Sequence, residues 1–171
     1  MRLRRFMKAC SFFGHRDTPQ TEELKAKVRE AVERLIVEEG VDTFLFGSRS
    51  KFDELCHMVI TKLKEKYPHI RRIAYLCNHE TGCLVGAGME LSRKIKEVTG
   101  REVYVPEYEE IKKSDRVNSA RCASYVERNQ WMIDDSEFAV FYINQSQRLN
   151  NVGTLRAFQY AKSKRKKFDC L

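Results

Sequence analysis

Short apolar runs alternate with longer amphipathic stretches along the whole chain. The apolar runs predict five core strands and one edge strand, at residues 9–13, 43–46, 70–76, 102–105, 138–143 and 167–171. Apolar residues at helical spacing predict helices at residues 18–39, 52–67, 89–99, 118–133 and 152–163. Strands that alternate with helices of this length form right-handed β–α–β units. The pattern therefore predicts a Rossmann-like three-layer α/β sandwich with a mainly parallel sheet.

Capping and breaking residues predict several of the helix ends. Thr18 is suited to the N-cap of the first helix, with Pro19 at the first helical position, where its missing N–H costs nothing. Gly40 and Gly100 end the first and third helices, and the second ends before Pro68. The glycine-rich residues 77–88 predict no regular element.

The length and composition fit one domain that spans residues 1–171. The chain has 171 residues, 42% of them apolar and spread along its length, which argues against disorder. No apolar run approaches the roughly 20 residues that a membrane helix needs, and the basic start lacks the apolar stretch of a signal peptide. We therefore expect a cytoplasmic protein that does not bind membranes.

The positive charge is concentrated at the two ends of the chain. The net charge is +8, but four basic residues lie within residues 1–8 and five within 162–167. Without these, 23 basic residues face 24 acidic ones. A duplex-binding protein spreads its basic residues over a docking face. Solvated ends, with cations that complement a helix dipole at 162–167, are the preferred interpretation over nucleic-acid binding.

The six cysteines do not form a pattern typical of a disulfide framework. Four of them fall in predicted strands or on predicted apolar helix stripes, as reduced core residues do: Cys10, Cys56, Cys122 and Cys170. Cys77, His79 and Cys83 have the spacing of a partial zinc site, but structural zinc normally takes four ligands. We expect no disulfide, no metal and no bound cofactor.

Ligands of parallel α/β sheets bind beyond the carboxyl ends of the strands, which directs attention to three loops. The first follows Phe13 and contains Gly14, His15 and Arg16. Its glycine allows close backbone approach, and Arg16 can form a two-pronged contact with phosphate at the start of the next helix. An ordinary surface turn explains these residues equally well.

The second loop follows Phe46 and combines a glycine, a hydroxyl and cations at a predicted helix start, which is a favourable anion site. Ser50 and Asp53 have the spacing of a capping box, and capping is the preferred role of this carboxylate. Sugar-hydroxyl binding or base catalysis are the alternatives for the two adjacent acids. The candidate residues of this loop are Gly47, Ser48, Arg49, Asp53 and Glu54.

The third loop follows Ile143 and is long and polar. It begins at Asn144 and leads to Gly153 and Thr154 at a helix start, where backbone N–H groups and a hydroxyl can hold phosphate. Such a pair is also ordinary helix-start chemistry. Three loops of this kind at one sheet edge predict a site for a phosphate-bearing, nucleotide-like molecule.

Several segments together resemble the YpsA-like branch of the SLOG superfamily. They are residues 10–16, 44–49 with 52–55, 128–134, and 153–154 with 160–161. The superfamily also includes the DNA-processing protein DprA and the "lonely guy" nucleotide hydrolases. The resemblance runs through nearly the whole chain in order, except for residues 77–117. Met7 directly precedes the part that resembles the family, so residues 1–6, or 1–7 with that methionine, are interpreted as an upstream extension. It implies a Rossmann-like sheet with a pocket for nucleotides or nucleotide-derived signals.

The same resemblance bears on catalysis. The phosphoribohydrolase members use an arginine from an Arg-Lys helix motif and a glutamate three residues after the threonine of a Pro-Gly-Gly-x-Gly-Thr stretch. Arg128 fits that arginine, but Asn129 replaces the lysine, residues 149–151 replace the Pro-Gly-Gly stretch, and Ala157 replaces the glutamate. An alanine can neither stabilise an oxocarbenium-like transition state nor transfer a proton.

Three functions remain open, in this order of preference. The first is a binding module or sensor for a nucleotide-like ligand, held by the three loops together with Arg128 and Asn129. The second is an N-glycosidic or phosphoribosyl hydrolase that uses Glu54 or Asp53. The third is a DprA-like interaction with single-stranded nucleic acid through the basic ends. The sequence leaves open whether the chain forms a homo-oligomer.

Overall fold

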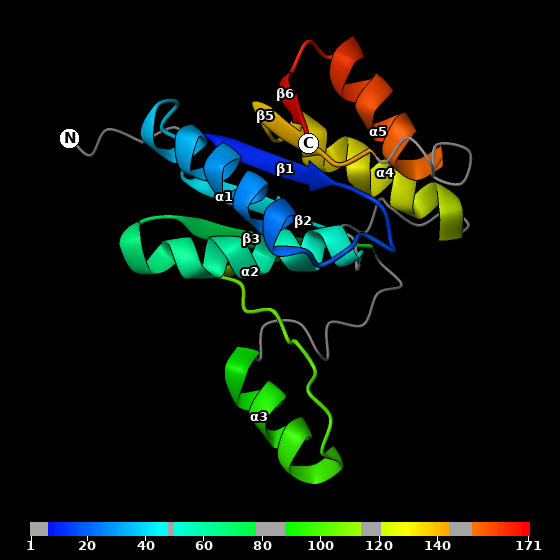
Figure 1. Ribbon diagram of the computed structural model, residues 1–171. Coiled ribbons are helices and arrows are strands. Elements are labelled where there is room, and N and C mark those ends of the chain that lie inside the picture. Colours follow the sequence, from blue (N-terminus) through cyan, green and yellow to red (C-terminus); the bar gives the residue numbers. More distant parts are fainter. Residues whose placement is uncertain (1–6, 48–49, 78–87, 114–120, 144–151) are drawn as a thin grey trace, which may run out of the picture.

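The computed structural model describes residues 7–47, 50–77, 88–113, 121–143 and 152–171. Six strands and five helices lie in these ranges (Figure 1). The strands are β1 (Ala9–Phe13), β2 (Thr43–Phe46), β3 (Arg71–Leu76), β4 (Glu110–Lys113), β5 (Phe138–Phe141) and β6 (Lys167–Cys170). The helices are α1 (Glu22–Val37), α2 (Lys51–Lys66), α3 (Gly88–Thr99), α4 (Arg121–Asp134) and α5 (Val152–Ser163). Within the described ranges, no helix is long and apolar enough to cross a bilayer.

All six strands form one sheet in the order β4-β3-β2-β1-β5-β6, and every pairing is parallel. β1 is central because Cys10 is paired with Phe44 of β2 on one side and with Phe138 of β5 on the other. The carboxyl ends of β1, β2 and β5 are therefore neighbours on one edge, as predicted. The expected Rossmann-like α/β architecture is confirmed, with β6 at the edge.

Side-chain alternation in β1 divides the core into two layers. Cys10 and Phe12 belong to a cluster with the buried faces of α1 and α2, whereas Ala9 and Phe13 belong to a second cluster with α4 and α5. Successive residues of a strand point to opposite faces, so a fully buried apolar strand requires a cover on both. In Figure 1, α1 and α2 accordingly lie on one side of the sheet and α4 and α5 on the other.

Helix α1 begins three residues later than the sequence suggests. Its N-cap is Thr21, whose hydroxyl accepts from the Leu24 N–H, so the assignment of Thr18 and Pro19 to the helix start is wrong. The Thr18 hydroxyl instead donates to the His15 carbonyl at 2.7 Å and closes a turn in the loop after β1. Threonine side chains make both kinds of local bond, and only the path of the chain distinguishes them.

The prediction of a strand at residues 102–105 is also wrong, because that segment has no regular structure and β4 follows at Glu110–Lys113. Its apolar residues serve another purpose: Val105 is buried against the sheet end, and Pro106 lacks the N–H that a ladder needs. The observed strand contains three charged residues and was not recognisable by its hydrophobicity.

An ion pair fixes the start of β4 beside β3. Arg72 donates two side-chain hydrogen bonds to the Glu109 carboxylate, at 2.9 and 3.1 Å, and its backbone N–H donates a third at 2.8 Å. The Glu109 N–H returns a bond to the Arg72 carbonyl at 2.9 Å. Partial burial opposes ionisation of Glu109, but the bonds from Arg72 and Lys64 prevail and lower its pKa to about 2. Charge pairing therefore replaces apolar burial in holding this edge strand.

The cysteines divide by position. Cys10, Cys56 and Cys77 are buried free thiols, and burial raises the pKa of Cys10 and Cys56. Cys170 is also free but exposed on the edge strand, so its assignment to the core is wrong. The Cys122 side chain lies outside the described residues.

Breaking the Arg72–Glu109 pair should destabilise the protein more than breaking the pair beside it. The Arg72 side chain is 6% exposed, and Glu109→Gln leaves it without its counter-charge, at a cost of about 2 kcal/mol in the free energy of unfolding. Glu110→Gln is the matched control because the Arg71–Glu110 pair is 39% and 40% exposed, and its loss should cost less than about 1 kcal/mol. Urea denaturation measures both, and equal losses would contradict the anchoring role of Glu109.

Candidate functional site

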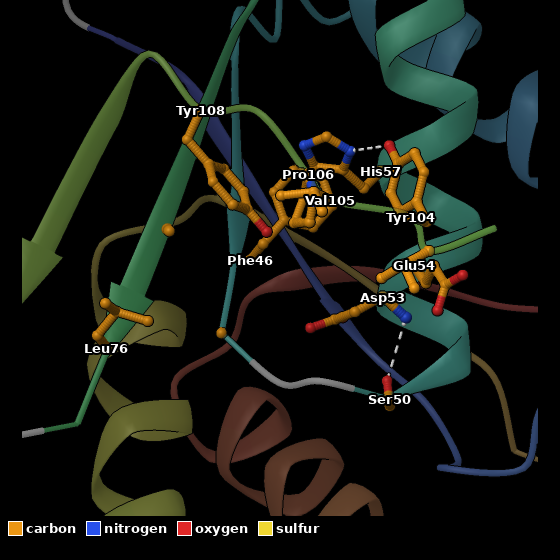
Figure 2. A pocket seen from close by; sticks show the side chains of 13 residues that line it. Phe46, Ser50, Asp53, Glu54, His57, Leu76, Tyr104, Val105, Pro106 and Tyr108 are labelled. Atoms are coloured by element: carbon orange, nitrogen blue, oxygen red, sulfur yellow. Dashed lines mark hydrogen bonds between the residues drawn. The ribbon is translucent and has the colours of Figure 1, made fainter. Parts of the chain in front are cut away.

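A cavity of about 210 Å³ lies beyond the ends of β2 and β3, between α2 and the segment that precedes β4 (Figure 2). Its position is the one that parallel topology favours for ligands. The polar lining comes largely from the start of α2 and the apolar lining from the sheet and residues 103–108. The cavity is lined by Phe46, Gly47, Ser50, Asp53, Glu54, His57, Ala74, Leu76, Val103, Tyr104, Val105, Pro106 and Tyr108.

The first turn of α2 supplies the acidic end of this cavity. Ser50 is the N-cap, as the capping-box spacing predicted, and its hydroxyl accepts from the Asp53 N–H at 3.1 Å. Asp53 is 4% exposed, whereas Glu54 is half-buried and forms a 3.1 Å ion pair with Lys51. Figure 2 shows the two acidic side chains leaving α2 in different directions. Asp53 is thus the buried carboxylate of the cavity, and Glu54 is the solvent-screened one.

Aromatic rings form the other end. The His57 ring centroid lies 5.1 Å from that of Phe46 and 4.9 Å from that of Tyr108, both in edge-on contacts, and Tyr108 lies 5.9 Å from Phe46. Tyr104 completes the group at 5.6 Å from His57. These separations are those of favourable aromatic pairs. The rings join β2, α2 and the segment before β4 into one apolar wall.

His57 is held as a neutral imidazole. Its Nε2 faces the Glu107 carbonyl at 2.8 Å, and a carbonyl only accepts, so Nε2 carries the proton. Nδ1 then accepts from the Tyr104 hydroxyl and lies 3.3 Å from the Thr61 hydroxyl. Burial lowers the pKa of His57 to about 4, opposed by the Glu107 carbonyl and reinforced by the charge of Arg72. His57 therefore anchors the cavity wall rather than exchanging protons near neutral pH.

Gly47 and Arg128 are brought together, as expected for residues of one site. A Cβ on Gly47 would lie 2.4 Å from the Met132 sulfur and 2.8 Å from Arg128 Nε, so only glycine fits between β2 and α4 here. Arg128 is 2% exposed, with its guanidinium 4.9 Å from the Tyr125 ring centroid. Among the described residues, Gly47 lines the cavity and Arg128 lies directly behind it.

The loop after β1 packs against the start of α2. A Cβ on Gly14 would lie within 2.5 Å of three Phe52 atoms, so this glycine permits helix packing rather than approach of a ligand. The Arg16 carbonyl accepts from the Lys51 N–H at 3.1 Å, while the Arg16 side chain is exposed. His15 is buried, and desolvation lowers its pKa. The first and second loops therefore form one structural unit.

The third loop is only partly described. Gly153 is exposed and Thr154 is buried at the start of α5, and Asn129 is half-buried on α4. None of these three lines the cavity described above. Ser48, Arg49 and Asn144 lie outside the described residues, as do His79 and Cys83 of the possible zinc cluster. In the part of the chain that is described, no three His, Cys, Asp or Glu side chains form a metal-binding group.

The basic residues at 162–167 lie away from the cavity. They run from the last turn of α5 into β6, whose Lys167 is paired with Phe138 at the start of β5. This is the amino edge of the parallel sheet, opposite the candidate site. Their charge is therefore separate from that site.

The aromatic wall was missed at the level of sequence. A signal for His57 existed, because Asp53 and His57 are four residues apart and share a helix face. The tyrosines give a weaker signal, because the apolar pattern of residues 102–105, which include Tyr104, predicts a strand rather than part of a site. They contact His57 only because their segment, nearly fifty residues further along the chain, crosses the end of the sheet.

The buried imidazoles should make the fold sensitive to acid. The pKa of His57 is about 4 when folded and about 6.5 when unfolded, so its stabilising effect is complete above pH 6.5 and is lost as the pH falls towards 4. Of the decrease in unfolding free energy over that interval, His57 should account for up to about 3 kcal/mol.

Urea denaturation at several pH values tests this contribution. The variant His57→Gln should reduce the pH dependence of the unfolding free energy between pH 6.5 and 4, with the remainder due to His15 and other groups. His69→Gln is the control because that histidine is exposed. An unchanged pH dependence in His57→Gln would contradict the neutral, buried assignment.

The chain is similar to a distant relative among known proteins. No protein-family model matches the chain. The chain is 27% identical over 146 residues to the uncharacterized SPbeta prophage-derived protein YoqJ of Bacillus subtilis (strain 168), across 84% of this chain and 83% of that protein. The chain is therefore similar, along most of its length, to a prophage protein described as uncharacterized.

Proposed function

We propose that the chain binds a nucleotide or nucleotide-derived ligand at the carboxyl edge of its sheet, as a sensor or regulatory module of the YpsA-like branch of the SLOG superfamily. The observation that carries this proposal is the cavity at the ends of β2 and β3, with the buried Asp53 carboxylate at the first turn of α2. Sugar hydroxyls are natural donors to such a carboxylate. The sequence resemblance at residues 44–49 and 52–55 falls on the same elements.

The phosphate end of the ligand is assigned to the cavity end formed by Gly47 and Ser50. The N-terminus of α2 carries a partial positive charge that favours anions, while its Lys51 and Asp53 N–H groups are bonded within the protein. The buried guanidinium of Arg128 lies directly behind Gly47 and adds positive potential there. Together these features provide an electropositive end next to an acidic, hydroxyl-binding position.

Binding is preferred over hydrolysis because of Ala157. It stands where the related hydrolases carry a glutamate, and it is buried in the apolar cluster with Phe141 and Ala161. A carboxylate at that position would be surrounded by the core rather than by solvent, with a large desolvation cost. Ala157→Glu is therefore expected to destabilise the fold and not to create an enzyme.

A hydrolase that uses a different carboxylate is the second candidate. The burial of Asp53 at the cavity supports it, since burial is one of the means by which enzymes adjust the pKa of a catalytic acid or base. Incubation with nucleoside monophosphates and detection of free base separates the two candidates. Release at about 1 per second, in the ordinary range of enzymes, with loss in Asp53→Asn, would favour the hydrolase.

Isothermal titration with nucleoside mono- and diphosphates and ADP-ribose tests binding. Asp53→Asn keeps the size of the side chain but removes its charge, and should weaken the tightest ligand by about 10- to 150-fold, the loss typical of a charged hydrogen bond. Arg128→Ala should weaken binding in the same range if its charge acts at the phosphate end.

Asp134→Asn provides the matched control because Asp134 is exposed at the far end of α4 and bonds to Tyr160. Its affinity should equal that of the wild type. Circular dichroism establishes that each variant is folded. Binding that is unaffected by Asp53→Asn and Arg128→Ala in folded protein would refute the proposed site.

A further inference from the structure

We infer that the aromatic end of the cavity is a subsite for a planar heterocyclic ring, so that the ligand is a nucleoside phosphate rather than a sugar phosphate. This inference rests on the proposed function, which places the phosphate and the sugar at the start of α2, and it adds a position for the base. The ring-binding wall consists of Phe46, His57, Tyr104 and Tyr108, with Ala74, Leu76 and Val105 adjoining it. It is built largely by residues 103–108, outside the segments that carry the family resemblance.

The two ends of the cavity differ in chemistry and lie a nucleoside's length apart. Ser50 and Asp53 occupy one end and His57 the other, and Figure 2 shows Tyr108 and Phe46 gathered beside His57. His57 is seven positions after the N-cap Ser50, which is about 10 Å along α2 at the helical rise per residue. A sugar at Asp53 would therefore place an attached base at the aromatic end.

The aromatic end offers mainly ring and apolar surface, with the tyrosine hydroxyls among its few polar groups. Both nitrogens of His57 are engaged within the protein, by the Glu107 carbonyl and the Tyr104 hydroxyl. Ala74, Leu76 and Val105 add buried apolar surface. A phosphate or a bare sugar would lose most of its hydration there for few hydrogen bonds in return, whereas a flat aromatic ring would gain stacking and apolar contact.

The cavity volume limits how much of the ligand is enclosed. At about 210 Å³ it falls below the roughly 300–1,000 Å³ of sites that enclose a drug-sized molecule. A base with part of its sugar fits this description, and the phosphates would then lie outside, towards Gly47 and the helix start.

The wall is fixed in place from both sides. His57 accepts a hydrogen bond from the Tyr104 hydroxyl and donates one to the Glu107 carbonyl. On the other side, Arg72 binds the carboxylate of Glu109, the residue that follows Tyr108. A ring-binding surface that is already ordered spends little free energy on arranging itself when the ligand binds. The two anchors therefore act as positioning groups for the ring subsite.

The test measures, by isothermal titration, the affinity of the wild-type protein for three classes of probe: ribose 5-phosphate, the four common nucleosides, and their 5′-monophosphates. We expect at least one monophosphate to bind about tenfold or more tightly than ribose 5-phosphate. Tyr108→Leu removes a ring but keeps apolar volume, and should weaken that monophosphate by about 3- to 10-fold without changing ribose 5-phosphate. Tyr108→Phe keeps the ring and should retain the affinity.

Tyr160→Leu is the matched control, because Tyr160 lies on α5 and bonds to Asp134, away from the cavity. Its affinities should equal those of the wild type. The wild-type comparison stands even if Tyr108→Leu does not fold. A shift in the ultraviolet absorbance of the bound base, lost in Tyr108→Leu, would report stacking directly.

The outcomes separate this inference from the proposed function. Equal affinity for ribose 5-phosphate and every monophosphate would overturn the ring subsite while leaving phosphate-ligand binding intact. Binding of a nucleoside with no gain from its phosphate would support the ring subsite and contradict the assigned phosphate end. Failure of these probes, and of the nucleoside diphosphates and ADP-ribose, to bind would overturn both.

Discussion

The parallel direction of all six strands is the constraint on which the rest of this structure depends. Parallel strands need a crossover between them, and the crossovers here are mostly helices that cover both faces of the sheet. Since every strand ends at the same edge, the loops that follow β1 and β2 meet there without any special contact between distant residues. The bond from the Lys51 N–H to the Arg16 carbonyl is a consequence of this arrangement.

Close packing at that edge explains the two glycines better than ligand approach alone. Gly14 accommodates the Phe52 ring, and Gly47 accommodates Met132 and Arg128. These contacts bring β1, β2, α2 and α4 so close that a methyl group would not fit. A rigid edge of this kind is a suitable support for a binding site, because its groups are ordered before a ligand arrives.

The segment before β4 is held by polar contacts where the apolar core ends. Arg72, Thr61 and His57 form a connected set, since the Thr61 hydroxyl accepts from Arg72 at 3.0 Å and lies next to His57 Nδ1. The set ties β3 and α2 to residues 104–109. Buried polar groups are costly when unpaired, so such a network specifies one arrangement of the segment. The same residues that hold the edge strand thus also shape the cavity.

Hydrophobic periodicity by itself determined the alternation of strands and helices, the parallel sheet and the edge at which a site belongs. These features depend on local spacing, and buried strands such as 43–46 and 138–141 carry it strongly. Candidate residues Gly47, Asp53 and Glu54 followed from the same logic, because they lie between the end of a strand and the first turn of the next helix.

Only the tertiary structure decided which residues enclose the cavity and where its wall begins. β4 is charged and was missed because its position depends on the pairing of Glu109 with Arg72, thirty-seven residues away. In the sequence, His57 falls on the apolar stripe of a helix, and only its contacts with Tyr104 and Glu107 in the folded chain show that it belongs to the cavity wall. Contacts between residues so far apart leave no periodicity in the sequence, since their free energy arises from burial and charge pairing after the chain has folded.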